Sequence, residues 1–322
     1  MRGLLRAELS RIRCRRMTWI VLLVGLLFVG LNAYAAYDMA KPLSIAEQQR
    51  ADEEYQRQLK QYDEHKDQML ASCREAQATS PEIRCDDMKP RREWFGKPAA
   101  TMTSTWEMFR DGAGFFFGLL ALLLGASYVG AEFGSGAIAN WLTFEPRRGR
   151  VFVSKLAAPV LATLVGGAVL VAGLVAICYG VLSLAQGRTD VARDVWVDVA
   201  QSGLRMVGFL GLCSLGGAAA AFLLRRTAAV TGLVIGYGVL EQIFSHSLGE
   251  RVRWTLMNNA AAVLSNEHTI AWSRCEQAAD GHYACHGFSE PVFAMQGFAV
   301  LGGVTLAVIL LAWLVFRSRD VA

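Results

Sequence analysis

Long apolar runs alternate with short charged segments along the whole chain. A hydrocarbon core about 30 Å thick needs about 20 apolar residues of helix, because lipid offers the backbone no hydrogen-bond partners. Six runs approach or exceed this length, so the pattern predicts six membrane-spanning helices. They cover residues 17–36, 112–129, 156–185, 203–224, 228–244 and 292–316.

The first run has a second interpretation, because Ala-Tyr-Ala-Ala at residues 33–36 resembles the cleavage site of a signal peptide. A signal peptide has a shorter apolar core than this run. The long basic segment before residue 17 and the length of the run therefore favour a retained span.

Composition supports an integral membrane protein. Of the 322 residues, 53% are apolar and 19% are charged, and the mean hydropathy is +0.31. Intrinsic disorder is excluded because it needs low hydrophobicity, and the length excludes a secreted disulfide-rich miniprotein. The expected fold class is an all-α polytopic membrane protein with six transmembrane helices.

The distribution of basic residues predicts the orientation. The segment 1–16, the loop 130–155, the link at 225–226 and the tail 317–322 together carry fourteen basic residues against four acids. The outer loop 186–202 carries two arginines and three acids, and the outer loop 245–291 carries three arginines and five acids. Because Lys and Arg gather on the cytoplasmic side, both termini are predicted to be cytoplasmic. Abundant Ala, Gly, Val and Arg favour a high-GC bacterium, hence a bacterial plasma membrane.

The first outer loop, residues 37–111, is long enough to form a helical insertion. Ser44 and Glu47 form a capping-box pattern, and no Gly or Pro follows until after residue 72. A narrow apolar stripe indicates either a solvated helix packed on its own hairpin or a helix that contacts a partner or a second copy. The stripe consists of Tyr55, Leu59, Tyr62 and Met69.

Four cysteines lie in outer loops, where an even number predicts two disulfides. Three pairings are open, and short sequence separations favour the local ones, Cys73–Cys85 and Cys275–Cys285. A zinc site formed by the second pair with His282 and His286 is the alternative, although the spacing does not match a common ligand frame. In the last outer loop, residues 245–291, short apolar segments indicate interfacial or re-entrant helices.

Motifs of enzymes are absent from the sequence. There is no phosphate-binding loop, metal-binding His-Glu-x-x-His helix or nucleophile turn. Few ionisable residues lie within the spans, which argues against a proton-coupled or ion carrier. Asp111 and Arg205 lie at outer ends, and Glu241 is either an end-of-helix carboxylate or a proton or substrate ligand. We expect no enzymatic activity, no metal site and no directly bound cofactor.

The loop after the second span carries the most informative motif. Glu132 is followed by Gly134-Ser135-Gly136, an amphipathic stretch at 137–144, Pro146-Arg147-Arg148, and Lys155 at the head of the third span. This order resembles the first cytoplasmic loop of the type-2 permease family of ATP-binding-cassette (ABC) exporters. The basic amphipathic segment before residue 17 and the closing Arg-Ser-Arg-Asp also resemble that family. The enlarged loop 37–111 departs from it.

The resemblance implies a chain that receives work from a separate ATPase. Two ATPase subunits that use ATP and Mg²⁺, a second permease copy or a related permease, and membrane lipid are the expected partners, with no nucleic acid. The loop would be the ATPase contact, with Trp141, Leu142 and Phe144 as apolar anchors. The full set of coupling residues is Glu132, Gly134, Gly136, Ile138, Trp141, Leu142, Phe144, Pro146, Arg147 and Arg148.

Alternatives stay open for this loop and for the function. The amphipathic stretch could be buried at the membrane interface, and the arginines could serve topology and anionic lipid. The leading function is export of a lipophilic, peptide-like or antibiotic-like substrate. The alternative is mechanotransmission or assembly, in which the outer loop binds a partner and no substrate moves.

Overall fold

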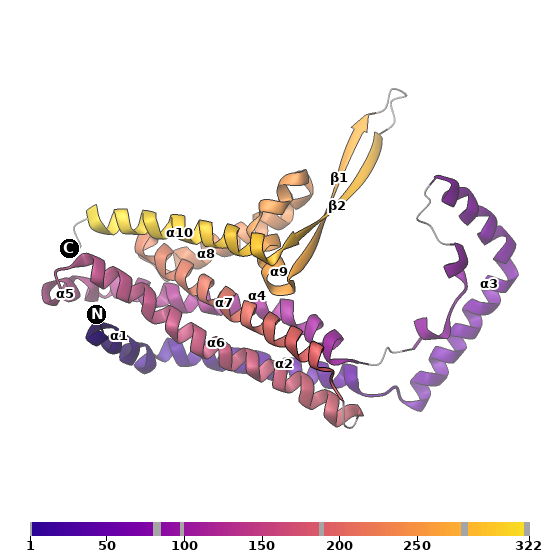
Figure 1. Ribbon diagram of the computed structural model, residues 1–322, viewed down its shortest axis with the longest axis horizontal. Helices are drawn as coiled ribbons and strands as arrows, with labels where there is room; N and C mark the ends of the chain where they lie inside the picture. Colours follow the sequence, from indigo (N-terminus) through magenta and orange to yellow (C-terminus); the bar gives the residue numbers. More distant parts are fainter. Residues whose placement is uncertain (1, 80–84, 97–99, 187–189, 278–282, 319–322) are drawn as a thin grey trace. The chain divides into compact units, whose positions relative to one another are not determined.

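The computed structural model describes residues 2–79, 85–96, 100–186, 190–277 and 283–318, which are mostly helical (Figure 1). Six of the helices are long and apolar enough to cross a membrane: α2, α4, α6, α7, α8 and α10. The elements are α1 (Arg2–Cys14), α2 (Arg16–Ala40), α3 (Ile45–Thr79), α4 (Met102–Gly134), α5 (Ala137–Phe144), α6 (Arg148–Gln186), α7 (Arg193–Leu224), α8 (Thr227–Phe244), α9 (Leu256–Ser265), β1 (Glu267–Gln277), β2 (Tyr283–Phe293) and α10 (Ala294–Ser318), with short 3₁₀ turns at Cys85–Met88, Arg92–Trp94, Ser245–Ser247 and Gly249–Trp254.

All six expected spans correspond to these helices, but several helices extend beyond the apolar runs. Helix α4 begins at Met102, before the span expected at 112, and α7 begins at Arg193, inside the expected loop 186–202. A hydropathy pattern marks only the segment of a helix that lies in the hydrocarbon core and must therefore be apolar. A helix continues into water wherever its polar residues tolerate helical geometry, so the connecting loops are shorter than expected.

The chain forms two compact units. The first contains Met1–Tyr34, Met102–Tyr179 and Asp190–Ala322, and the second contains Ala35–Thr101 and Gly180–Thr189. The first unit is a helical bundle with the extensively paired helices α4 and α7 inside it. A Cβ atom at Gly125 would overlap the carbonyl oxygen of Ser214, and one at Gly217 would overlap that of Leu122. Glycine is therefore required for the backbones to approach this closely.

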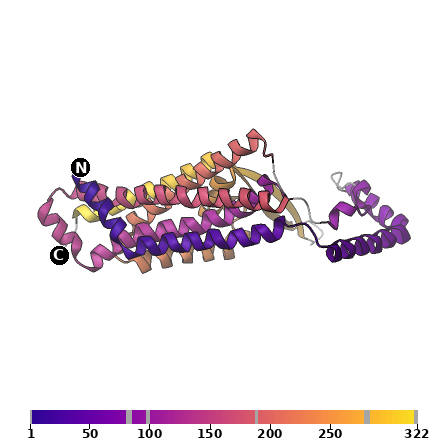
Figure 2. The same ribbon diagram turned by 90° about the horizontal axis from the view of Figure 1, so that it is seen from below.

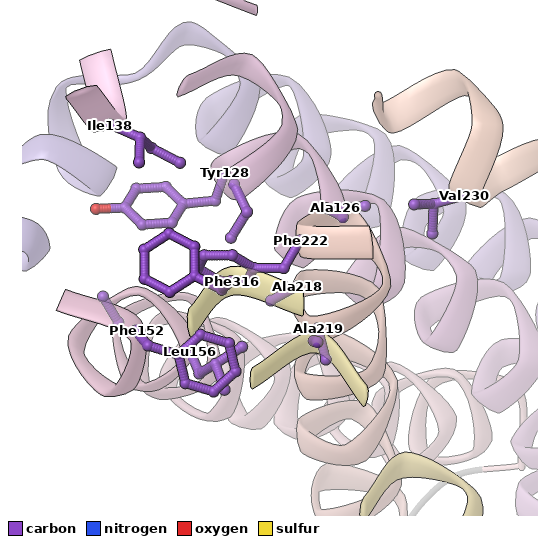
Figure 3. Close-up of a cluster of buried hydrophobic side chains, with 14 of the residues drawn as sticks. Ala126, Tyr128, Ile138, Phe152, Leu156, Ala218, Ala219, Phe222, Val230 and Phe316 are labelled. Carbon is purple, nitrogen blue, oxygen red and sulfur yellow. The ribbon is translucent and has the colours of Figure 1, made fainter. Parts of the chain in front are cut away.

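One end of the bundle gathers α1, α5 and the C-terminal part of α10 (Figures 1 and 2). A buried apolar cluster joins them to α4, α6, α7 and α8. Phe152, Phe222 and Phe316 lie at its centre, with ring centroids 4.7–6.0 Å apart (Figure 3). Ile12 of α1 and Ile138 of α5 are buried against the same cluster. This end of the bundle is thus a continuous packed core rather than a loose collection of loops.

A β-hairpin in the last loop corrects the expectation of an all-α chain. Strands β1 and β2 pair antiparallel in the loop where only interfacial or re-entrant helices were expected, and α9 is a short helix in the same loop. The alternation of Ile270 and Trp272 puts both on one face, where Ile270 and Val292 pack on Val252 and Ala262. The sequence signal was a period of two with β-branched and aromatic residues. This signal is too short to register as a membrane-length apolar run.

The second unit is built on α3. Ser44 and Glu47 form the expected capping box: Glu47 accepts from the Ser44 backbone N–H at 2.8 Å, and Ser44 Oγ accepts from the Glu47 N–H at 3.3 Å. The expected disulfide Cys73–Cys85 is present, and Arg92 pairs with Asp52 at 2.5 Å. Within this unit Tyr62 is buried and Tyr55 contacts the ring of Phe95, so part of the apolar stripe packs on the following segment.

The second cysteine pair lies in the hairpin, where the register places Cys275 directly opposite Cys285. Directly opposite residues on antiparallel strands have Cα atoms close enough for a disulfide. Their sulfur atoms, like His282 and the side chain of His286, lie outside the described part of the chain. The zinc alternative therefore also falls outside it.

We predict that both outer pairs are oxidised in the purified protein. A maleimide added to the denatured, unreduced chain should label Cys14, Cys178 and Cys213, which are free thiols, and should spare Cys73, Cys85, Cys275 and Cys285. Peptide mass spectrometry measures this directly. Labelling of Cys275 and Cys285 without prior reduction would exclude the second disulfide.

Candidate functional site

The short helix α5 lies between α4 and α6 and begins after a tight turn. Gly136 has φ of 69°, a left-handed conformation that favours glycine. Ile138 is fully buried, and Leu142 packs against the apolar cluster described above. Phe144, in contrast, is 86% exposed. Helix α5 therefore has an inner face fixed to the bundle and an outer end that presents one aromatic ring.

Beneath α5 lies a buried group of charges that joins three helices. The ammonium of Lys155 on α6 is 2.8 Å from Glu8 Oε1 on α1 and 2.5 Å from Glu132 Oε2 on α4. Lys155 and Glu8 are inaccessible to solvent, and Glu132 is nearly so. A buried ion is costly unless it is paired. The lysine therefore holds two carboxylates that come from two different helices, α1 and α4.

Aromatic and arginine side chains enclose these charges. The hydroxyl of Tyr128 donates to the carboxylate of Glu8, and Trp141 of α5 lies 5.1 Å from the Lys155 ammonium, measured to its ring centroid. Arg11 stacks on the same indole at 4.4 Å and lies 3.9 Å from Glu132. Cation–π contacts of this kind favour a cation over the ring face. The enclosure thus attaches α5 to the same charges that join α1, α4 and α6.

Arginines also secure the ends of two spans. Arg15, between α1 and α2, donates to the carbonyl oxygens of Ser127 and Tyr128 at 3.3 and 3.0 Å. Arg148 donates to the carbonyl oxygens of Phe316 and Arg317 at 3.2 and 3.1 Å, at the end of α10. Carbonyl groups in the last turn of a helix lack helical partners. Arg148 satisfies two such groups at the end of α10. Arg15 instead adds a second hydrogen bond to carbonyl oxygens inside α4 and joins the link between α1 and α2 to that helix.

The expected coupling residues divide into two groups in the structure. Glu132, Ile138, Trp141 and Leu142 face other parts of the chain, and Arg148 is engaged with α10. The remaining five coupling residues are exposed to solvent: Gly134, Gly136, Phe144, Pro146 and Arg147. Trp141 and Leu142 are therefore already packed within the chain, and Phe144 is the available apolar anchor. The contact with an ATPase itself stays a prediction.

Four residues of this site were not predicted from the sequence: Glu8, Arg11, Arg15 and Tyr128. Lys155 was predicted only as part of the loop motif. One signal was present: Glu8 is the one acid among six arginines in the first sixteen residues. A single acid in an otherwise basic helix indicates a partner elsewhere in the chain, and in the structure that partner is Lys155. Nothing in the spacing of positions 8 and 155 shows that they meet.

A large apolar cleft lies elsewhere in the bundle. Its volume is about 810 Å³, and helices α4, α7, α8, α9 and α10 line it with side chains such as Phe116, Leu212, Val239 and Val304. Pockets that bind small molecules are typically of this size and mostly apolar. The cleft could therefore accommodate a lipophilic molecule.

Glu241, near this cleft, has a structural partner. Its two carboxylate oxygens lie 3.2 Å from the backbone N–H of Met257, in the first turn of α9. A carboxylate at a helix N-terminus satisfies a free N–H and interacts favourably with the helix dipole. This contact favours the end-of-helix interpretation. Among the residues that the structure describes, no group of His, Cys, Asp and Glu is arranged to hold a metal ion.

Comparison with known proteins gives one match. A family model described as ABC-2 family transporter protein matches residues 3–321, nearly the whole chain. The match includes α1, the insertion and the loop that carries α5. No curated protein and no solved structure matches the chain.

We predict that Lys155→Met destabilises the protein strongly, because it leaves two buried carboxylates without their cation. Removing one partner of a buried pair typically costs about 3–5 kcal/mol. The variant should unfold at a clearly lower temperature, and trypsin should cleave it faster within α1, whose Glu8 is no longer held. Thermal unfolding and a proteolysis time course measure the two effects.

Arg150→Met is the matched control, because Arg150 is half exposed and lies 3.7 Å from Glu145. Surface pairs contribute about 0–1 kcal/mol, so this variant should resemble the wild type. Adding Glu132→Gln to Lys155→Met should recover part of the stability by removing one unpaired charge. Equal stability of Lys155→Met and Arg150→Met would contradict the structural role given to Lys155.

Proposed function

This chain belongs to the ABC-2 transporter family, and on that basis we propose that it is the membrane-spanning permease subunit of an ATP-driven exporter. Its cargo is a lipophilic, peptide-like or antibiotic-like compound. ATP and Mg²⁺ are bound by a separate ATPase, two copies of which join two permeases in the complex. The end of the bundle with α5 faces the cytoplasm, in agreement with the asymmetry of basic residues.

The observation that carries this proposal is the connection of α5 to the spans. An ATPase that moves cargo must act on a cytoplasmic protrusion that is rigidly joined to moving helices. Helix α5 meets this requirement, because Trp141 and Ile138 attach it to the packed end of the bundle. Lys155 then connects that end to α1, α4 and α6 through Glu8 and Glu132. A movement of α5 at Phe144 would therefore be transmitted to α1, α4 and α6 together.

Two further features support the cargo class and the second permease. The apolar cleft of about 810 Å³ suits a lipophilic molecule better than an ion or a sugar. Helices α8 and α10 bury only 11% of their most apolar window within one copy, against 67% for α4. Such exposed helical faces require lipid or another protein, and a second permease would cover part of them.

The second candidate function is mechanotransmission without cargo. The observation that favours it is the insertion, which forms a compact unit of its own with a disulfide and the ion pair between Arg92 and Asp52. A folded appendage of this size suits binding of a partner outside the membrane. ATP-driven motion of the bundle would then act on that partner.

We predict that Phe144→Asp disrupts the contact with the ATPase while the bundle stays folded. Loss of an apolar anchor at an interface costs about 2 kcal/mol or more, and an unpaired carboxylate in its place adds to this. The variant should retain less ATPase in co-purification from detergent, with unchanged thermal unfolding. Asn140→Asp is the control, because it adds the same charge to an exposed position of α5 without removing an apolar ring. Normal retention of the ATPase by Phe144→Asp would contradict docking at this helix.

We predict that Val239→Trp, which fills part of the apolar cleft, abolishes stimulation of ATP hydrolysis by cargo. The measurement is the ATPase activity of the assembled complex against a panel of lipophilic peptides and antibiotics. Val169→Trp is the matched control: Val239 is 54% and Val169 is 56% exposed, but only Val239 lines the cleft. Stimulation that survives in Val239→Trp would exclude the cleft as the cargo site. Absence of stimulation in the wild type would favour mechanotransmission.

A further inference from the structure

A second, polar cavity lies in the helical bundle, at the opposite end of α4 from Glu132. The first turns of α4 and α7 and the junction of α9 with β1 enclose about 250 Å³ there. In contrast to the apolar cleft, most of its lining is polar or charged, with two arginines and two acids. Its volume is below the range of pockets for drug-sized molecules, so it suits a small polar group.

The two arginines are the innermost charges of this cavity. Arg205 is half-buried, and its buried Nε makes no hydrogen bond within the described structure. The side chain of Arg110 is only 11% exposed, and its Nε donates to Asp111 at 2.8 Å. Arg110 repels the Arg205 cation, so the pair has excess positive charge that Asp111 only partly offsets. A buried donor without a partner is costly, and a bound anionic group would satisfy it.

The wall of the cavity is held by a buried contact between α4 and α7. The indole Nε1 of Trp106 donates to Ser202 Oγ at 2.8 Å, and that hydroxyl donates to the carbonyl oxygen of Val199 at 3.0 Å. Trp106, Ser202 and Val199 are all buried. These bonds fix the spacing of the two helices, so the cavity exists before a ligand binds and little ordering is needed on binding.

The acids of the cavity occupy its rim. Glu107 and Asp198 are exposed, whereas the arginines lie deeper. Asp198 attracts the Arg205 cation, but the two form no ion pair within 4 Å in the described structure. The site is therefore positive inside and negative at its edge. This distribution of charge fits a zwitterion whose anionic group lies deep in the cavity and whose ammonium group lies at the rim, near the water.

We propose that this cavity binds a phosphoethanolamine head group, with the phosphate on Arg205 and Arg110 and the ammonium on Glu107 and Asp198. A guanidinium presents donors in a fork that fits phosphate oxygens, and carboxylates accept hydrogen bonds from a primary ammonium. A phosphoglycerol head group has no cation for the rim. The source of the group is a membrane lipid or soluble phosphoethanolamine. The proposal is independent of the ATPase and of the cargo.

The test is calorimetric titration of the purified full chain in detergent with three probes: dihexanoyl phosphatidylethanolamine, dihexanoyl phosphatidylglycerol and free phosphoethanolamine. Phosphatidylethanolamine should bind about tenfold or more tightly than phosphatidylglycerol, since a hydrogen bond to a charged group is worth at least that factor. If free phosphoethanolamine binds as tightly as phosphatidylethanolamine, the natural ligand is the soluble compound. If it binds more weakly than phosphatidylethanolamine, the natural ligand is the lipid. Either result supports the site.

Variants distinguish the cavity from unspecific binding. Arg205→Gln should weaken binding of phosphatidylethanolamine about tenfold or more, whereas Arg193→Gln, at an exposed arginine of α7 outside the cavity, should not. Asp198→Asn combined with Glu107→Gln should remove the preference over phosphatidylglycerol. If Arg205→Gln does not fold, Arg205→Lys, which keeps the charge without the fork, should bind with intermediate affinity.

Three results would overturn the proposal. They are no saturable binding of either ethanolamine probe to the wild type, equal affinity for the two lipids, and wild-type affinity in folded Arg205→Gln or Arg205→Lys. None of these results bears on whether an ATPase binds α5. Failure of this proposal and failure of the proposed function are therefore separate outcomes.

Discussion

The ion contacts of Lys155 organise one end of this protein. A lysine with no access to solvent holds Glu8 from the first helix and Glu132 from the end of α4, under an aromatic cover. Each of these ions would be strongly unfavourable in a dry environment by itself, so all of them must be in place together. The consequence is that α1, α4, α5 and α6 meet in one fixed arrangement. Apolar packing around Phe222 surrounds the charges but cannot specify such an arrangement alone.

Elsewhere, polar groups in the bundle serve helix ends and helix contacts. Glu241 caps α9, Trp106 binds Ser202 between α4 and α7, and Arg148 binds carbonyl oxygens at the end of α10. The middle of the bundle relies on close backbone approach at Gly125 and Gly217. Because lipid provides no hydrophobic force between helices, small residues and satisfied polar groups must supply the association.

The two ends of the bundle consequently have different chemistry. One end has a fixed charged core and an exposed aromatic residue, Phe144, on a short helix. The other has a small polar cavity with Arg205 inside and acids at its rim. Between them lies an apolar cleft. On the two proposals made above, this division would separate the contact with the ATPase, the passage of a lipophilic molecule and the recognition of a polar head group.

The sequence by itself determined the features that depend on neighbouring residues. Apolar length located all six helices, the capping box at Ser44 marked a helix start, and order and spacing around Pro146 identified the family. The tertiary structure decided which charges meet, because Glu8 and Lys155 are 147 positions apart and no periodicity relates them. It also decided that Trp141 faces inward and Phe144 outward, since an eight-residue helix can turn either side toward its bundle. The direction of α5 follows from packing at Ile138 and from the cations beneath the indole, which only the folded chain brings together.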